Sequence, residues 1–162
     1  MMNYSRPARK SIRLKGYDYT SSGAYFVTIC TKDRRHLLGT FVGGDALVGP
    51  HIELTHYGRT VEKYINSIGH VYPDILVDSF TVMPNHIHFI VLLSGSPKAA
   101  TPTKTGLPGI VNSLKGLTSK QCGISLWQRG YYEHVVRGEN DLREIREYIA
   151  HNPQKWETDE YF

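Results

Sequence analysis

The stretch 81–93, TVMPNHIHFIVLL, decides how the rest of the chain is interpreted. An apolar, β-branched run after a Pro-Asn turn predicts a strand. Because successive side chains of a strand point to opposite faces, His86 and His88 point the same way and form half of a possible metal site. Ile90 and Leu92 continue this face as an apolar patch. The opposite face is expected to pack on helices through Ile87, Phe89 and Val91.

A second interpretation of the two histidines stays open on spacing alone. Histidines on one face of a strand are often exposed to solvent, or buried with ordinary hydrogen bonds. His-x-His by itself therefore does not establish a metal site. The rest of the sequence has to decide between the two interpretations.

Length and composition predict one globular domain. The chain has 162 residues, of which 40% are hydrophobic and 21% charged, so it is long enough to bury a core. No apolar run approaches the ~20 residues that a membrane span requires, and the first residues lack an apolar signal core. Cys30 and Cys122 form no Cys-x-x-Cys pair. We therefore expect a cytoplasmic protein with reduced cysteines and no membrane partner.

Positive charge gathers at the N-terminus. The formal net charge is +4, and residues 1–35 carry eight basic side chains against two acidic ones. We interpret residues 1–22 as a basic N-terminal arm suited to phosphate contacts, although a solvated tail would have the same composition. The basic side chains of this arm are Arg6, Arg9, Lys10, Arg13 and Lys15.

Hydrophobic periodicity predicts four strands and three helices. The strands are expected at 24–31, 75–82, 86–93 and 131–137. The helices are expected at 54–69, 109–122 and 140–152. This order predicts an α+β fold of the ferredoxin-like (RRM-like) type, in which a four-stranded antiparallel sheet carries helices on one face and a further C-terminal helix bears Tyr148.

Two stretches are expected to lack regular structure. Residues 39–50 contain four glycines and a proline, which predicts a loop. Residues 94–108 are rich in Ser, Thr, Gly and Pro, which is typical of a flexible internal linker. The domain prediction is therefore the arm followed by a single domain at 23–162. At the start of the last helix, Asp141 and Glu144 have the spacing of a capping box.

The C-terminal helix offers a possible partner for the histidines. Tyr148 and Asn152 are four residues apart, so they share one face of this helix. A tyrosine at such a position is often a half-buried packing residue, and an Asn before Pro153 often only ends a helix. The chain contains 11 tyrosines, and spacing alone does not select a nucleophile among them.

Three separated motifs carry a resemblance to a known family. They are MPNHIH at 83–88, WQRGYYEH at 127–134 and YIAHNP at 148–153. Together they resemble the REP-associated tyrosine transposases, relatives of the single-tyrosine insertion-sequence transposases among the HUH nucleases. The resemblance implies that His86 and His88 hold a divalent metal ion, that Tyr148 is the nucleophile, and that Asn152 completes the metal site.

The activity implied by this resemblance is metal-dependent cleavage and strand transfer of single-stranded DNA beside a palindromic hairpin. Attack by Tyr148 would form a 5′-phosphotyrosine intermediate, and the process would belong to DNA transposition and recombination or to repeat processing. Two imidazoles alone favour zinc, manganese or nickel. The resemblance instead implies magnesium or manganese.

The same resemblance suggests the partners. Hairpin DNA is the expected substrate, and a monomer is favoured slightly over a homodimer. Besides the arm, basic side chains that suit phosphate contacts are Lys115, Lys120 and Arg129. Tyr131 or Tyr132 would suit stacking on a base. His134 and His151 fit extra ligands less well than ordinary structural histidines.

Two other functions stay open from the sequence. The chain would also suit a non-catalytic module that binds hairpin nucleic acid on a ferredoxin-like sheet, which does not require His86 and Tyr148 to meet. A third possibility is a zinc hydrolase in which Tyr148 is passive and water is the nucleophile.

Overall fold

The computed structural model describes Gly16, residues 22–94 and residues 105–159. Arg6, Arg9, Lys10, Arg13 and Lys15 of the predicted arm lie outside the described residues, as do residues 95–104 of the predicted linker. Within the described part of the chain, no helix is long and apolar enough to cross a membrane.

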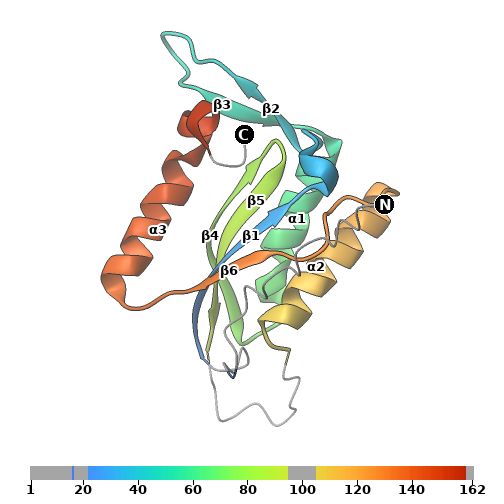
Figure 1. Cartoon of the computed structure of the whole chain (residues 1–162), viewed down its shortest axis with the longest axis vertical. Coiled ribbons are helices and arrows are strands. Elements are labelled where there is room, and N and C mark those ends of the chain that lie inside the picture. Colours follow the sequence, from blue (N-terminus) through green and yellow to red (C-terminus); the bar gives the residue numbers. More distant parts are fainter. Residues whose placement is uncertain (1–15, 17–21, 95–104, 160–162) are drawn as a thin grey trace, which may run out of the picture.

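A four-stranded antiparallel sheet forms the centre of the described structure (Figure 1). β4 and β5 form a hairpin through Pro84 and Asn85, and β1 pairs with β5 along its whole length. The strand order β4-β5-β1-β6 places the histidine strand next to the centre of the sheet. The strands are β1 (Gly23–Cys30), β4 (Ile75–Met83), β5 (His86–Leu93) and β6 (Tyr132–Val135).

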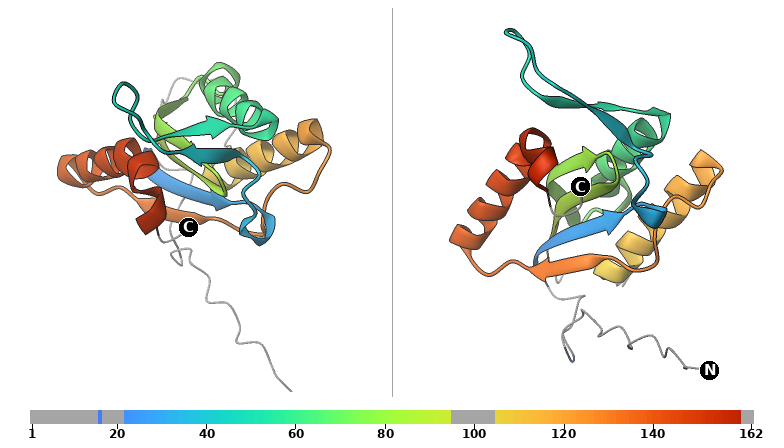
Figure 2. Two further views of the ribbon diagram at one scale, coloured as in Figure 1. Left: turned by 90° about the horizontal axis from the view of Figure 1, so that it is seen from above. Right: turned by 45° about the horizontal axis from the view of Figure 1, so that its top comes forward.

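Helices cover both faces of this sheet. α1 (His56–Val71) and α2 (Leu107–Cys122) pack on one face, and α3 (Glu139–His151) lies on the other (Figures 1 and 2). The predicted α+β fold, with two helices on one face and a C-terminal helix that carries Tyr148, is therefore confirmed.

The main hydrophobic core lies between the sheet and the helices α1 and α2. The strands contribute alternate side chains such as Val27 and Phe89, while α1 contributes Val61 and Ile65. On the α3 face the buried apolar residues of the second cluster are Phe26, Ile90 and Ile149. Successive side chains of β5 therefore lie alternately in the main core and on the α3 face, as predicted.

The start of α1 shows how local contacts fix a helix beside the sheet. The Thr55 hydroxyl accepts a hydrogen bond from the Gly58 N–H and donates one to the Leu37 carbonyl. A Cβ atom at position 58 would collide with the Leu38 carbonyl oxygen, so glycine permits this close approach. These contacts hold the first turn of α1 directly against the segment that precedes β2.

The prediction of a loop over residues 39–50 is wrong at its first four positions. β2 (Gly39–Val42) pairs with β3 (His51–Leu54) as a separate two-stranded sheet that projects beyond the main one (Figure 2). The remaining glycines of the stretch, Gly43, Gly44 and Gly49, lie between the two strands. They mark the connection of a hairpin and not the absence of strands.

The predicted capping box at the start of α3 is also wrong. The helix begins at Glu139, after Gly138 with a φ of +93°. The Asp141 carboxylate instead accepts hydrogen bonds from the Arg137 N–H and the His134 ring. α2 likewise begins earlier than predicted, at Leu107, because Pro108 is well tolerated in the first turn of a helix.

Candidate active site

The two histidines of the first motif form the buried centre of the site. They open β5, and their Nε2 atoms lie 3.0 Å apart. The Nδ1 atom of His86 lies 2.8 Å from the Asn85 amide oxygen, and that of His88 lies 2.7 Å from the Thr28 hydroxyl. Nδ1 of each ring thus has a side-chain partner, which comes from the turn between β4 and β5 for His86 and from β1 for His88.

These partners indicate how the two rings are protonated. An amide oxygen is only an acceptor, so Nδ1 of His86 must carry the hydrogen, and the Thr28 hydroxyl can accept the same bond from His88. In this pair of tautomers each ring presents the lone pair of Nε2 to the other, whereas a hydrogen on Nε2 of His88 would make the contact a hydrogen bond. Two such lone pairs 3.0 Å apart repel each other unless a proton or a metal ion lies between them, and this arrangement suits metal ligands.

Burial keeps these imidazoles neutral. It lowers the pKa of His86 from 6.5 to about 4, although the Asp159 carboxylate and the Asn152 amide both act to raise it. Burial also lowers the pKa of His88 well below its ordinary value, and the neighbouring His86 lowers it further. Neutral imidazole is the form that binds metal, so both ligands are ready at neutral pH.

Tyr148 approaches the histidine pair from α3 of the same chain. Its hydroxyl lies 3.4 Å from Nε2 of His88, and its ring contacts the rings of His88 and Phe26 edge-on. The side chain is 41% exposed, so the hydroxyl is accessible to a bound molecule. The packing of Ile149 in the second cluster holds this face of α3 against the sheet.

Asn152 lies one turn beyond Tyr148 and is almost fully buried. Its Nδ2 donates a hydrogen bond of 2.5 Å to the Asp159 carboxylate. Among the described residues, no hydrogen-bond partner reaches its Oδ1, which is also buried. A buried acceptor without a partner is costly, and a metal ion would supply the missing interaction.

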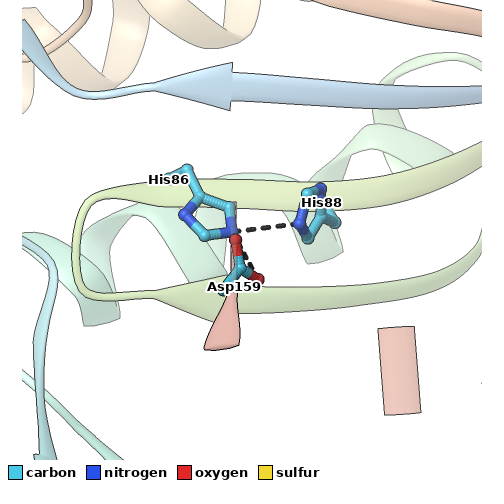
Figure 3. A group of neighbouring side chains, drawn as sticks. All are labelled: His86, His88 and Asp159. Carbon is cyan, nitrogen blue, oxygen red and sulfur yellow. Dashed lines mark hydrogen bonds and ion pairs between the residues drawn. The ribbon is translucent and has the colours of Figure 1, made fainter. Parts of the chain in front are cut away.

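Asp159 is the residue of this site that the sequence analysis missed. It follows the short 3₁₀ helix η2 (Asn152–Thr158), and its carboxylate lies 3.9 Å from Nε2 of His86. Figure 3 shows the carboxylate pointing toward the two rings on β5. Asp159 lies beyond the last periodic helix of the sequence, so no spacing rule connected it with the histidines.

The donor atoms fit one metal ion. Three possible ligand atoms, one each from His86, His88 and Asp159, lie within 4.8 Å of one another. Ligands bound at about 2.0–2.2 Å to a common ion are separated by distances of this order. Two neutral imidazoles, a carboxylate and the buried amide oxygen of Asn152 together form a donor set that suits a divalent ion.

A cleft of about 440 Å³ gives access to this centre from solvent. Tyr132 lines it from β6 and contacts the Phe26 ring, while Lys155 and His151 add basic groups beside Asn152. The cleft therefore combines aromatic surface, positive charge and the candidate nucleophile. Its lining residues are Phe26, Thr28, His88, Tyr132, Tyr148, His151, Asn152, Lys155, Thr158 and Asp159.

The other predicted DNA contacts that the structure describes do not line this cleft. Lys115 lies on α2, and its ammonium donates hydrogen bonds to the carbonyls of Gln128 and Gly130. Lys120 and Arg129 are exposed, near the end of α2 and in the following connection. These positions leave their predicted role as phosphate contacts untested.

The remaining predicted residues have local partners. His134 contacts the Asp141 carboxylate at 2.9 Å, and Nδ1 of His151 contacts the Glu147 carbonyl. Tyr131 packs against the main core and not in the cleft. Neither His134 nor His151 belongs to the metal-ligand group found among the described residues, and their expected structural role stays a prediction.

Comparisons with known proteins extend these observations. No family model matches the chain. An uncharacterised protein of Haemophilus influenzae is 35% identical over 95% of this chain and 93% of its own length. A second protein of that organism, provisionally named a REP-associated tyrosine transposase, is 25% identical over 85% of this chain and 74% of its own length.

The structure of a REP-associated tyrosine transposase bound to a REP hairpin has the same fold. It matches 86% of this chain and 72% of its own chain, with a TM-score of 0.61 and 22% identity. The chain thus resembles the REP-associated tyrosine transposases in sequence and in fold, as the three sequence motifs predict.

Proposed function

We propose that this protein is a metal-dependent DNA strand transferase that cleaves single-stranded DNA beside a palindromic hairpin. Tyr148 is the nucleophile, and the product is a 5′-phosphotyrosine, in DNA transposition or repeat processing. The approach of the Tyr148 hydroxyl to within 3.4 Å of His88 carries this proposal. A binding module would not require a tyrosine to meet the histidine pair.

The residue types of the site suit this chemistry. A phenol with an ordinary pKa near ~10 is a weak nucleophile at neutral pH and needs an activated phosphate. A magnesium or manganese ion held by His86, His88 and Asn152 would polarise the scissile phosphate and neutralise the charge that develops during the reaction. The edge-on contacts of Tyr148 with Phe26 and His88 orient its hydroxyl toward the same point.

Bond formation and cleavage balance at one phosphorus atom. The Tyr148 oxygen forms a bond to phosphorus, and its proton leaves to the solvent of the open cleft. The bond between phosphorus and the 3′-oxygen breaks, and that oxygen keeps the electron pair and takes up a proton as a 3′-hydroxyl. Because the phosphate stays covalently attached, a 3′-hydroxyl can attack it later and rejoin the strands.

Hairpin DNA is the proposed substrate. The solved relative is bound to a REP hairpin, and the present cleft carries Lys155 and the exposed ring of Tyr132, which suit a phosphate and a base. The arm residues, Lys120 and Arg129 would contact phosphates farther along the DNA. Since Tyr148 and His88 belong to one chain, we further propose that the monomer is active.

The test is covalent capture of labelled DNA. The protein is mixed with single-stranded hairpin oligonucleotides taken from the flanks of its own gene, with manganese, with magnesium or with chelator, and run on a denaturing gel. We expect a metal-dependent shifted band that Tyr148→Phe abolishes, while binding on a native gel persists. Tyr132→Phe is the matched control, because Tyr132 is the other tyrosine of the cleft and is equally exposed.

The outcomes separate the competing functions. An undiminished adduct with Tyr148→Phe would reject Tyr148 as the nucleophile. Hairpin binding without any adduct would favour the non-catalytic module. Cleaved DNA with a free 5′-phosphate and no adduct would indicate that water attacks, as in a zinc hydrolase.

A further inference from the structure

We propose that Asp159 is a fourth protein ligand of the metal ion, and that it holds the C-terminal segment 152–159 over the metal site. This inference rests on the metal ion of the proposed function. It adds a carboxylate ligand to the two histidines and the asparagine, and it assigns a role to a segment that follows the tyrosine helix.

The geometry is the first argument. The Asp159 carboxylate lies 3.9 Å from Nε2 of His86, on the same side of β5 as both rings (Figure 3). The Asn152 amide donates a hydrogen bond to the same carboxylate and so orients it. Metal ligands are commonly held by hydrogen bonds of this kind from neighbouring side chains.

Charge and burial are the second argument. The side chains of both His86 and Asp159 are fully buried. A divalent ion between the rings and the carboxylate would interact favourably with a carboxylate that has lost its hydration. The orphaned Oδ1 of Asn152 lies in the same buried group and would gain from the same ion.

The segment has a second attachment, through Trp156. Its buried indole stacks on His86, with 6.1 Å between ring centroids, and meets His36 edge-on at 5.3 Å. The Asp159 N–H donates to the Trp156 carbonyl, so the two residues belong to one turn. A metal ion bound by both Asp159 and His86 would therefore hold Trp156 against the His86 ring.

Metal binding by the full-length protein tests the ligand role without any DNA. Isothermal titration with Mn²⁺ is carried out on the unaltered chain, on Asp159→Asn and on Glu157→Gln. Glu157 is the matched control, because it is an exposed carboxylate of the same segment. We expect Asp159→Asn to weaken binding at least about tenfold, as losses among supporting groups of metal sites do, and Glu157→Gln to leave it unchanged.

Tryptophan fluorescence tests the coupling to the segment. The chain has two tryptophans, and in the described part of the structure Trp156 stacks on the proposed ligand His86, whereas the Trp127 indole donates to the Thr118 hydroxyl. We expect Mn²⁺ to quench the emission with the same midpoint as in calorimetry. Trp156→Phe should remove this quenching, and Asp159→Asn should shift its midpoint to higher Mn²⁺.

The outcomes distinguish this inference from the proposed function. If His86→Ala abolishes Mn²⁺ binding while Asp159→Asn binds as tightly as the unaltered chain, the metal site stands and the role of Asp159 is rejected. If the unaltered chain binds no metal ion, the metal part of the proposed function is rejected as well. Circular dichroism of each variant verifies that the fold is retained.

Discussion

The two faces of the sheet differ in what they bury. The face toward α1 and α2 holds a continuous apolar core, while the face toward α3 holds a much smaller apolar cluster and the histidine pair. Neighbours on β5 show the contrast, since Phe89 belongs to the first face and Ile90 to the second. One sheet therefore separates the part that stabilises the fold from the part that carries the chemistry.

This difference has a physical reason. Apolar burial supplies most of the free energy of folding, and buried polar groups without full partners reduce it. A site that buries two imidazoles and an amide oxygen without a hydrogen-bond partner among the described residues is costly. The large core on the opposite face can offset this cost, so the faces should respond differently to substitution.

The largest expected effect is the loss of the Phe89 ring. Phe89→Ala removes a fully buried ring from the main core and should lower the free energy of unfolding by about 3–5 kcal/mol. The adduct rate per folded molecule should hardly change, because the ring points away from the cleft. Urea unfolding measures the first quantity, and the covalent gel assay at low temperature measures the second.

Ile90→Ala is the matched substitution on the other face. Ile90 packs with Ile149 of α3, in the smaller cluster, so its truncation should cost less stability than the loss of Phe89. It should lower the adduct rate, because α3 would then hold Tyr148 less firmly beside the histidines. If both substitutions reduced the rate per folded molecule equally, the proposed separation between the two faces would be wrong.

Acid should destabilise the protein through the histidine face. The pKa of His86 is about 4 in the folded chain and 6.5 ordinarily, so between these values the unfolded state binds more protons. Stability is then complete above pH 6.5 and falls as the pH drops toward about 4, by roughly 1.4 kcal/mol per pH unit. Between pH 6.5 and 5 we expect a loss of about 2 kcal/mol in chelator.

Urea midpoints at pH 7, 6 and 5 measure this loss. His86→Gln should reduce the slope, because glutamine does not titrate, whereas His70→Gln on the exposed end of α1 should retain it. Stability that is constant from pH 7 to 5 would show that the imidazoles are not held neutral by burial.

The smallest expected effect concerns the cap of α1. Thr55→Ala removes the hydroxyl that accepts from the Gly58 N–H and should cost about 1 kcal/mol of stability. The adduct rate should stay unchanged, because α1 lies on the face away from Tyr148. A fall in rate with retained folding would contradict the independence of the two faces.

Much of the fold and half of the site could be predicted from local pattern. Alternation along 86–93 predicted that His86 and His88 share one face of a strand. The spacing of four residues predicted that Tyr148 and Asn152 share one face of a helix. Both rules act within a single element, so they need no knowledge of its neighbours. The hairpin β2–β3 was missed because its glycines suggested an uninterrupted loop.

The sequence by itself determined the order of the main strands and helices, and which side chains share a face of each. Only the tertiary structure decided that α3 lies over the histidine face, that Tyr148 meets His88, and that Asp159 enters the metal group. Contacts between residues far apart in the chain depend on how elements pack. Local periodicity specifies the face that an element presents, but it does not specify which element covers that face.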